Sequence, residues 1–312
     1  MKTGLVVKHT GIQYIVQFGE THKRINCTLR GKLRLKDDKT TNPIAVGDIV
    51  DIDFDENEES GAIVNVHSRK NYIIRKPSNL SKQAHIVAAN VDIAFLVVTL
   101  ALPETKLEFI DRFLLTTEAY HIPTIIIINK IDLYKNKLLK TTLAEFKDIY
   151  TKAGYEMLEV SATENININK LKDMMKNKVS VFLGNSGVGK STLINTIDDT
   201  QNARTGKISV AHKSGMHTTT FYEMFNLDFG GYIIDTPGLK GFGLIAEFAN
   251  EELYHFFPEI FKFSKNCKYN PCTHTHEPQC GVKTAVDNGY IPISRYINYL
   301  KIITDDNTKY RY

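Results

Sequence analysis

Short runs of alternating hydrophobic and polar residues fill the chain from Met1 to about Lys70, and Gly, Asn, Asp and charged residues separate them. No stretch here has the apolar period of an amphipathic helix. The pattern predicts short β-strands that close into a small barrel, and a partly open barrel of the oligonucleotide-binding (OB) type is the leading candidate. The alternation alone does not distinguish it from an SH3-like barrel. The expected strand regions are residues 4–18, 23–34, 49–54 and 61–67.

From about Asn90 the pattern changes to nearly continuous Ile and Val runs that alternate with amphipathic segments. Strands that are apolar on both faces belong to a parallel sheet covered by helices on both sides, so this part predicts a doubly wound α/β domain. The predicted strands are residues 91–99, 123–129, 155–160, 179–184, 221–227 and 231–235. The predicted helices are residues 108–121, 142–152, 171–175 and a segment that begins at Lys190.

Beyond about Gly243 the chain becomes aromatic, with predicted helices over residues 253–263 and 294–304. This part is too short to bury a large core, and a bound metal would supply stability that packing does not.

The segment between these two helices contains three cysteines and two histidines. Three thiolates and one imidazole form a closed tetrahedral ligand set, which is typical of a structural Zn²⁺ site, so about one zinc per chain is expected. On chemistry alone His276 could replace His274. The remaining cysteine, Cys27, is expected in the core. The predicted zinc ligands are Cys267, Cys272, His274 and Cys280.

With 312 residues, of which 42% are hydrophobic, the chain is long enough for two or three packed cores, which excludes a largely disordered protein. Its longest apolar stretches fall short of the roughly 18 residues that a helix needs to cross a bilayer. Lys8, His9 and Gln13 interrupt the N-terminal region, so it lacks the apolar segment of a secretory signal. We therefore expect a soluble, cytoplasmic protein. The net charge of +4 is modest and does not by itself indicate a partner.

Positive charge concentrates at residues 23–36 of the predicted barrel, whereas residues 51–59 of the same barrel are acidic. This distribution indicates one basic face, which could follow the phosphate backbone of a nucleic acid. A solvated pair of charged strands is an equally simple explanation, because aromatic residues for base stacking are sparse in this region and Tyr14 and Phe18 are the only nearby candidates. The basic residues are Lys23, Arg24, Arg30, Lys32, Arg34 and Lys36.

A glycine-rich motif, Gly-x4-Gly-Lys-Ser, lies between the predicted strand 179–184 and the helix that begins at Lys190. Here backbone N–H groups and a helix N-terminus can surround phosphates, because glycine leaves no side chain in the way. Lys190 would neutralise terminal phosphate oxygens, and the Ser191 hydroxyl would bind Mg²⁺. The predicted phosphate-binding residues are Gly184, Asn185, Ser186, Gly187, Val188, Gly189, Lys190, Ser191 and Thr192.

Asn-Lys-Ile-Asp directly follows the Ile-rich strand 123–129, at the sheet edge where the phosphate motif is expected. A carboxylate at Asp132 can accept the N1–H and N2–H donors of guanine, whereas adenine presents an acceptor at N1. Asn129 can bond the N7/O6 edge, and the stem of Lys130 can lie along the base. Ser161 and Ala162, after another strand, can supply a backbone N–H to O6. The predicted base-binding residues are Asn129, Lys130, Ile131, Asp132, Ser161 and Ala162.

A weaker motif, Asp-Thr-Pro-Gly, ends the strand 231–235. The Asp235 carboxylate can reach the Mg²⁺ shell from the C-terminal edge of the sheet, and Gly238 completes the motif. Without a phosphate loop in the same chain, a surface turn would be as good an explanation.

Together these motifs resemble those of the translation-factor class of GTPases in everything but order. Ordinary members begin with the phosphate loop, whereas here the base-binding motifs precede it, as in circularly permuted GTPases. With an N-terminal barrel and a C-terminal Cys-x4-Cys-x-His-x5-Cys pattern, the chain resembles the bacterial RsgA (YjeQ) family over essentially its whole length.

The resemblance implies a multidomain α/β protein, with an OB-fold RNA-binding domain over residues 1–70, a circularly permuted GTPase domain over residues 71–243 and a zinc-binding helical domain over residues 244–312. It implies a GTP hydrolase that uses GTP, Mg²⁺ and Zn²⁺ and acts in late maturation of the small ribosomal subunit. Such a protein would bind rRNA as a monomer and couple its nucleotide state to release.

The resemblance also suggests roles in the predicted first switch, residues 199–217 and the threonines after it. Thr219 is expected to bind Mg²⁺, with Thr218 or Thr220 as alternatives. Leu239 stands where Ras-like GTPases carry a water-orienting glutamine, so hydrolysis without a partner is expected to be slow. His217 is the expected substitute, although Met216 replaces the arginine that commonly precedes it in the family.

Two other functions use fewer of these motifs. A nucleotide-gated RNA-binding module with incidental hydrolysis would bind RNA equally with GDP and GTP. An ATP-dependent kinase or transporter ATPase would share the phosphate loop, but Asp132 disfavours adenine. The chain runs from Asp-Thr-Pro-Gly through residues 239–243 into the C-terminal module, so a nucleotide-driven change could move that module.

Overall fold

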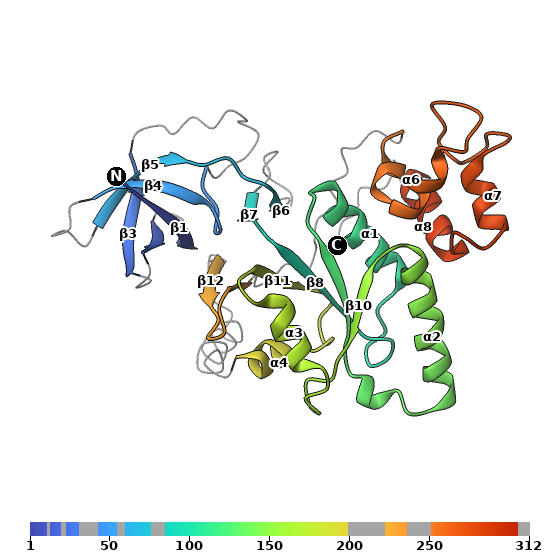
Figure 1. Cartoon of the computed structure of the whole chain (residues 1–312), viewed down its shortest axis with the longest axis horizontal. Helices are drawn as coiled ribbons and strands as arrows, with labels where there is room; N and C mark the ends of the chain where they lie inside the picture. The colour runs from blue at the N-terminus through green and yellow to red at the C-terminus, as the bar shows by residue number, and fades with distance from the viewer. Residues whose placement is uncertain are drawn as a thin grey trace. The chain divides into compact units, whose positions relative to one another are not determined.

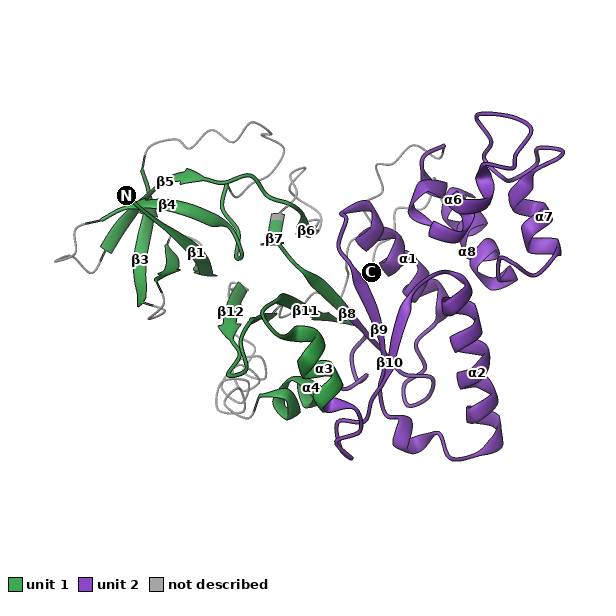
Figure 2. Ribbon diagram, in the orientation of Figure 1, with its two compact units in different colours: residues 1–94, 169–183, 190–243 green, residues 95–168, 184–189, 244–312 purple. Residues whose placement is uncertain are grey.

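The computed structural model describes residues 1–10, 13–19, 23–30, 43–54, 60–75, 85–198, 222–235 and 251–304, and Figure 1 shows their helices and strands. The chain divides into two units (Figure 2). Unit 1 contains residues 1–94, 169–183 and 190–243, and unit 2 contains residues 95–168, 184–189 and 244–312.

Among the described residues of unit 1, five strands form the predicted OB-like barrel. The order β1-β2-β3-β5-β4 closes on itself because β1 also pairs with β4, and β3 and β5 are parallel. Alternate residues fill the interior, and Cys27 is among them, as predicted. The region 4–18 contains two strands rather than one. The strands are β1 (Lys2–His9), β2 (Tyr14–Phe18), β3 (Lys23–Leu29), β4 (Ile49–Asp53) and β5 (Ser60–Val66).

One aromatic candidate for base stacking is wrong. Tyr14 is only 4% exposed and belongs to the barrel core, where its ring stacks on His9 with centroids 4.7 Å apart. It therefore offers no free face to a base. Phe18 packs against Phe54, with ring centroids 5.0 Å apart.

The barrel is continuous with the second sheet region of unit 1. β1 pairs antiparallel with β12 (Tyr222–Asn226), which pairs antiparallel with β13 (Tyr232–Asp235), and β13 lies parallel to β11 (Val179–Leu183). Lys8 of β1 donates to Glu223 of β12 over 2.7 Å. The predicted parallel sheet therefore has antiparallel strands at this end. Two helices of this region are α3 (Ile168–Met175) and α4 (Lys190–Ile197).

A hairpin that the sequence pattern did not predict lies after the barrel. Strands β6 (Tyr72–Arg75) and β7 (His85–Ala89) pair with each other in a separate sheet. Gly47 approaches this hairpin closely, because a Cβ atom there would lie 2.0 Å from the carbonyl oxygen of Ala89. With φ at +94°, this position requires glycine.

Unit 2 contains the part of the α/β fold that carries the predicted base-binding residues. The strand order is β10-β9-β8, with β9 and β10 parallel. The side chains of β8 are buried along its whole length, as the sequence pattern predicts for a strand covered on both faces. The elements are β8 (Ile93–Val98), α1 (Leu107–Ala119), β9 (Thr124–Ile128), the 3₁₀ turn η1 (Ile131–Leu133), α2 (Lys137–Lys152) and β10 (Glu156–Glu159).

Helix α2 begins five positions before its predicted start at residue 142, at Lys137. Asn136 is its N-cap, since the Asn136 side chain accepts a hydrogen bond of 2.8 Å from the backbone N–H of Leu139. An N-cap of this kind satisfies an N–H group that the first turn leaves without a helical partner. The prediction was wrong because it followed the apolar period and overlooked the cap.

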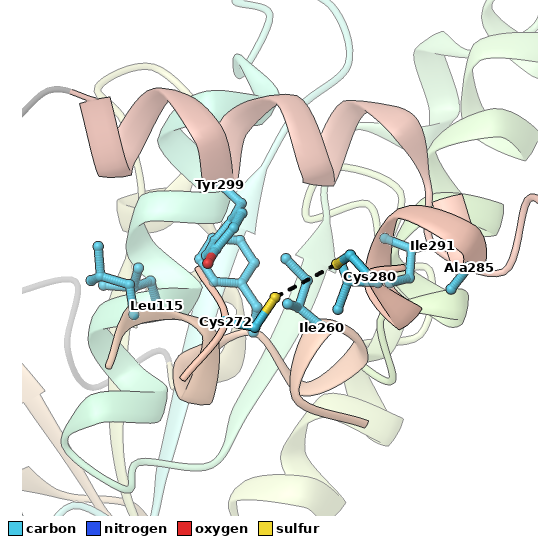
Figure 3. Packing of buried hydrophobic residues seen from close by; sticks show 10 residues of the cluster. Leu115, Ile260, Cys272, Cys280, Ala285, Ile291 and Tyr299 are labelled. Carbon is cyan, nitrogen blue, oxygen red and sulfur yellow. Dashed lines mark hydrogen bonds between the residues drawn. The ribbon is translucent and has the colours of Figure 1, made fainter. Parts of the chain in front are cut away.

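The C-terminal helices of unit 2 pack around a hydrophobic cluster that includes Leu115 of α1 (Figure 3). Phe257, Ile260 and Tyr299 lie at its centre, each with no exposed surface. The module therefore shares its core with α1. Its elements are η3 (Leu253–Phe256), α6 (Pro258–Ser264), α7 (Gly281–Asp287) and α8 (Ile293–Thr304). None of the described helices combines the length and the apolar character that a membrane crossing requires.

A buried ionic cluster lies at the same junction. Arg295 of α8, which is 0% exposed, donates to Asp111 of α1 over 2.8 Å and to Glu259 of α6 over 2.7 Å. Asp111 also accepts hydrogen bonds from Tyr150 of α2, over 2.9 Å, and from Asn298 of α8, over 2.6 Å. Charged and polar side chains from four helices thus satisfy one another's hydrogen-bonding groups.

Candidate guanine-nucleotide and zinc sites

The phosphate loop, residues 184–189, leaves β11 and enters α4, as predicted. Three of its glycines have positive φ: Gly184 at 144°, Gly187 at 83° and Gly189 at 95°. A Cβ atom at Gly184 would lie 2.2 Å from the carbonyl oxygen of Val97, and one at Gly189 would lie 2.4 Å from Nδ2 of Asn129. The backbone therefore takes a course that only glycine permits, which leaves its N–H groups accessible to a phosphate.

The Asn-Lys-Ile-Asp turn directly contacts the phosphate loop. Nδ2 of Asn129, a residue only 2% exposed, donates to the carbonyl oxygen of Val188 over 2.9 Å. Nζ of Lys130 donates to the carbonyl oxygens of Gly187, over 2.8 Å, and of Leu102, over 2.6 Å. The sequence placed both motifs at one sheet edge, and the structure brings them into hydrogen-bond contact.

The carboxylate of Asp132 is oriented by Ser161. The Ser161 hydroxyl, which is fully buried, donates to Oδ1 of Asp132 over 2.6 Å. The backbone N–H of Ile131 donates to the carbonyl oxygen of Val160, and Ala162 is 8% exposed. The two predicted base-binding segments, residues 129–132 and 161–162, are therefore held together by hydrogen bonds.

These residues fit a guanine nucleotide. Oδ1 of Asn129 is buried and has no hydrogen-bond partner among the described residues, and such an atom is costly to leave unpaired. Asn129 uses one amide hydrogen on Val188, which leaves its second N–H and Oδ1 for a ligand. The fit thus rests on an unpaired polar edge beside a glycine cradle.

The rest of the predicted nucleotide site is only partly described. Lys190 begins α4, and its partial burial lowers the pKa of its ammonium group from the ordinary value. Ser191 and Thr192 follow in the first turn, both exposed, and Asn185 and Ser186 complete the loop. Asp235 is the last residue of β13. Other predicted positions lie outside the described residues: Met216, His217, Thr218, Thr219, Thr220, Gly238 and Leu239.

The predicted zinc ligands converge. The ligand atoms of Cys267, Cys272, His274 and Cys280 all lie within 4.8 Å of one another. The Cys280 sulfur is 3.8 Å from that of Cys267 and 3.9 Å from that of Cys272. Figure 3 shows the contact between Cys272 and Cys280. Zn–S bonds of about 2.3 Å in a tetrahedral centre place sulfur atoms about 3.8 Å apart, so the donor set fits zinc. None of the cysteines forms a disulfide.

Protonation and the neighbouring loop support the same ligand set. Burial lowers the pKa of His274, which favours the neutral imidazole that binds a metal. His276, the alternative ligand, is exposed and contacts Thr275 instead. Glu277, which the sequence analysis did not single out, accepts backbone hydrogen bonds from Thr273 and Thr275 and so fixes the loop around His274.

Comparison with known proteins agrees with this geometry. The family model described as RsgA GTPase matches residues 66–245, and that of the RsgA N-terminal domain matches residues 3–63. The small ribosomal subunit biogenesis GTPase RsgA of Flavobacterium psychrophilum is 50% identical over 99% of this chain and 94% of its own length. Its counterpart from Phocaeicola vulgatus is 50% identical over 99% of this chain and 98% of its own.

Solved structures lead to the same family. The crystal structure of YjeQ from Thermotoga maritima has a TM-score of 0.79 at 38% identity and covers 99% of both chains. That of YloQ, described as a circularly permuted GTPase, has a TM-score of 0.78 at 30% identity and covers 100% of this chain and 97% of its own. GTPases of this kind use GTP and Mg²⁺. The chain belongs to the RsgA family of circularly permuted GTPases, which hydrolyse GTP.

Proposed function

We propose that this GTPase acts in late maturation of the small ribosomal subunit, where it binds rRNA and couples its nucleotide state to release. The observation that carries the nucleotide part is the contact between Asn129 and Val188, because it joins base recognition to the phosphate loop. The ribosomal part is supported by relatives, each at least 49% identical, that are named small ribosomal subunit biogenesis GTPases.

Guanine recognition is assigned to the turn that follows β9. Asp132, oriented by Ser161, accepts the two N–H donors of the guanine edge, and Asn129 bonds the opposite edge. The stem of Lys130 covers the base, and the backbone of Ala162 donates to O6. The base is thereby tied to the same loop that holds the phosphates, so its position fixes theirs.

Catalysis is assigned to the phosphate loop, to the predicted first switch with the threonines after it, and to the Asp-Thr-Pro-Gly motif. Lys190 would neutralise the terminal phosphate, and Ser191 and Thr219 would hold Mg²⁺ together with Asp235. The metal would supply positive charge beside the phosphates on which negative charge develops. Hydrolysis without a partner is slow, because Leu239 occupies the position of the water-orienting glutamine and cannot bond water. His217 orients the attacking water instead.

The barrel and the zinc module, which flank the GTPase domain in sequence, are assigned to contacts with the ribosomal subunit. The barrel, residues 1–70, presents Lys23 and Arg24 as exposed basic residues at the start of β3, and these follow an rRNA backbone. The zinc module, residues 244–312, is held in shape by one structural Zn²⁺. The protein acts as a monomer in the cytoplasm.

The deciding experiment measures GTP hydrolysis without a partner, with purified small ribosomal subunits and with large subunits. Small subunits are expected to raise the rate at least tenfold, and large subunits are not. Equal rates in all three conditions would contradict the ribosomal role but leave the GTPase assignment intact. A competition assay tests guanine-nucleotide binding separately from the ribosomal role: GTP should displace labelled GDP, and ATP should not.

A further inference from the structure

The hydroxyl group of Tyr134 lies between the ends of two strands of unit 2. The side chain is 4% exposed, and the residue follows the 3₁₀ turn η1 directly. Its hydroxyl donates to the carbonyl oxygen of Asn129 over 3.0 Å and accepts the backbone N–H of Leu100 over 2.7 Å. The hydroxyl is therefore fixed from both sides and joins the segment after β9 to the segment after β8.

The carbonyl that Tyr134 holds belongs to the peptide between Asn129 and Lys130. Lys130 has φ of 62°, in the left-handed region, which non-glycine residues adopt only where neighbouring contacts compensate for the strain. A hydrogen bond to the preceding carbonyl restrains this peptide. It thereby restrains the directions in which the Asn129 and Lys130 side chains leave the backbone.

The second contact of Tyr134 reaches Lys130 by another path. Leu100 begins a short loop that is closed by hydrogen bonds between Thr99 and Thr105, one of them 2.8 Å long between backbone atoms. The carbonyl oxygen of Leu102, at the tip of this loop, accepts the ammonium group of Lys130 over 2.6 Å. Tyr134 thus anchors both the backbone of Lys130 and the loop that receives its amine.

We propose that Tyr134 is a positioning residue for guanine-nucleotide binding, which acts through Asn129 and Lys130 and does not touch the nucleotide. The inference rests on the proposed nucleotide site. Nothing in the residue pattern after Asn-Lys-Ile-Asp predicts it, because a tyrosine there could equally be a core residue.

The test is the substitution Tyr134→Phe, which keeps the ring and removes only the hydroxyl. We expect the Kd for GDP and the KM for GTP to rise about tenfold, because the substitution removes both buried hydrogen bonds that hold the binding-competent form. The kcat at saturating GTP should stay within about twofold. Tyr150→Phe is the matched control. Tyr150 is also buried, and its hydroxyl donates to Asp111, away from the proposed nucleotide site. This substitution should lower the melting temperature without changing the Kd.

A double-mutant cycle separates positioning from general loss of stability. If Tyr134 acts through Lys130, Tyr134→Phe should weaken GDP binding much less in a Lys130→Ala background than in the wild-type chain. Full additivity, an unchanged Kd in Tyr134→Phe, or equal weakening in Tyr150→Phe would each overturn the inference. Failure of the wild-type chain to bind GDP would instead contradict the proposed nucleotide site.

Discussion

Arg295 of α8 and Asp111 of α1 form an ion pair in which the two side chains are 0% and 1% exposed. Because the pair joins the C-terminal module to a helix of the GTPase fold, the module is anchored on α1. A nucleotide-driven movement of the C-terminal module, expected above from its link to Asp-Thr-Pro-Gly, would have to carry α1 along or break this cluster.

Arg295→Ala should therefore be strongly destabilising. It leaves the carboxylates of Asp111 and Glu259 buried without their cation, which typically costs about 3–5 kcal/mol. Urea unfolding measures the loss. Lys301→Ala is the control, since Lys301 is 54% exposed and lies 3.9 Å from Glu108, and it should cost less than about 1 kcal/mol. Equal effects of the two substitutions would contradict the structural role of the cluster.

Cys272→Ser should abolish stoichiometric zinc. With one thiolate lost from a four-ligand set, affinity falls sharply and the module loses its stabilising centre. Metal analysis of the purified protein should give about one zinc per chain for the wild type and much less for the variant. Cys27→Ala is the matched control, because Cys27 is just as buried but lies in the barrel core. Zinc loss in the control would point to general unfolding instead.

Gly189→Ala should abolish nucleotide binding. The added Cβ would lie 2.4 Å from Nδ2 of Asn129, and φ is +95°, so the phosphate loop and the base-binding turn would both have to shift. Gly154→Ala is a close control, with φ of +91° and nothing within 4 Å of its Cβ. It should cost about 1 kcal/mol of stability and leave GDP affinity unchanged. A titration with labelled GDP compares the two variants.

Asp132→Asn should change the base preference. An amide in place of the carboxylate loses one acceptor for guanine and gains a donor for the C2 carbonyl of xanthine, so GDP affinity should fall about a hundredfold and xanthosine diphosphate should bind better. Competition titrations with both nucleotides give the ratio. Glu164→Gln, at an exposed neighbouring site, should change neither. An unaltered ratio in Asp132→Asn would remove that residue from base recognition.

Asp51 of the barrel gives a pH-dependent prediction. Hydrogen bonds from Asn65, His67 and Thr3 lower its pKa from 3.8 to about 2. Because the folded pKa lies below the ordinary value, its contribution to stability is complete above 3.8 and disappears as the pH falls towards 2. The Asp51→Asn variant should therefore have a lower melting temperature than the wild type near neutral pH. The difference in melting temperature should shrink as the pH falls from 3.8 towards 2. Asp53→Asn, at an exposed pair with Arg30, should show no such difference.

The sequence allowed prediction of the features that follow from local chemistry. Glycine spacing located the loop between β11 and α4, cysteine spacing located the four residues whose ligand atoms converge, and apolar runs located most strands of the α/β fold. Motif logic even placed Asn129 and the phosphate loop at one edge, since both follow parallel strands.

Features that depend on partners distant in sequence could not be predicted. Arg295 and Asp111 are 184 positions apart, and charged residues are normally exposed, so the pattern gave no reason to bury them. The burial of Tyr14 could not be predicted either, since its position in an alternating strand does not reveal which face closes the barrel. The positioning role proposed for Tyr134 could not be predicted from the sequence, because it depends on the two partners of its hydroxyl group.

The pairing of β1 with β12 constrains how the chain can fold during synthesis. Lys8 and its partner Glu223 are 215 positions apart, and at about 5–20 residues per second the ribosome needs roughly 10–40 s to make the interval. The barrel can close on itself long before that, through β1 and β4. The edge of β1 that pairs with β12 stays unpaired until β12 has been made. Strands β12 and β13 of the GTPase sheet then assemble against a barrel that has already folded.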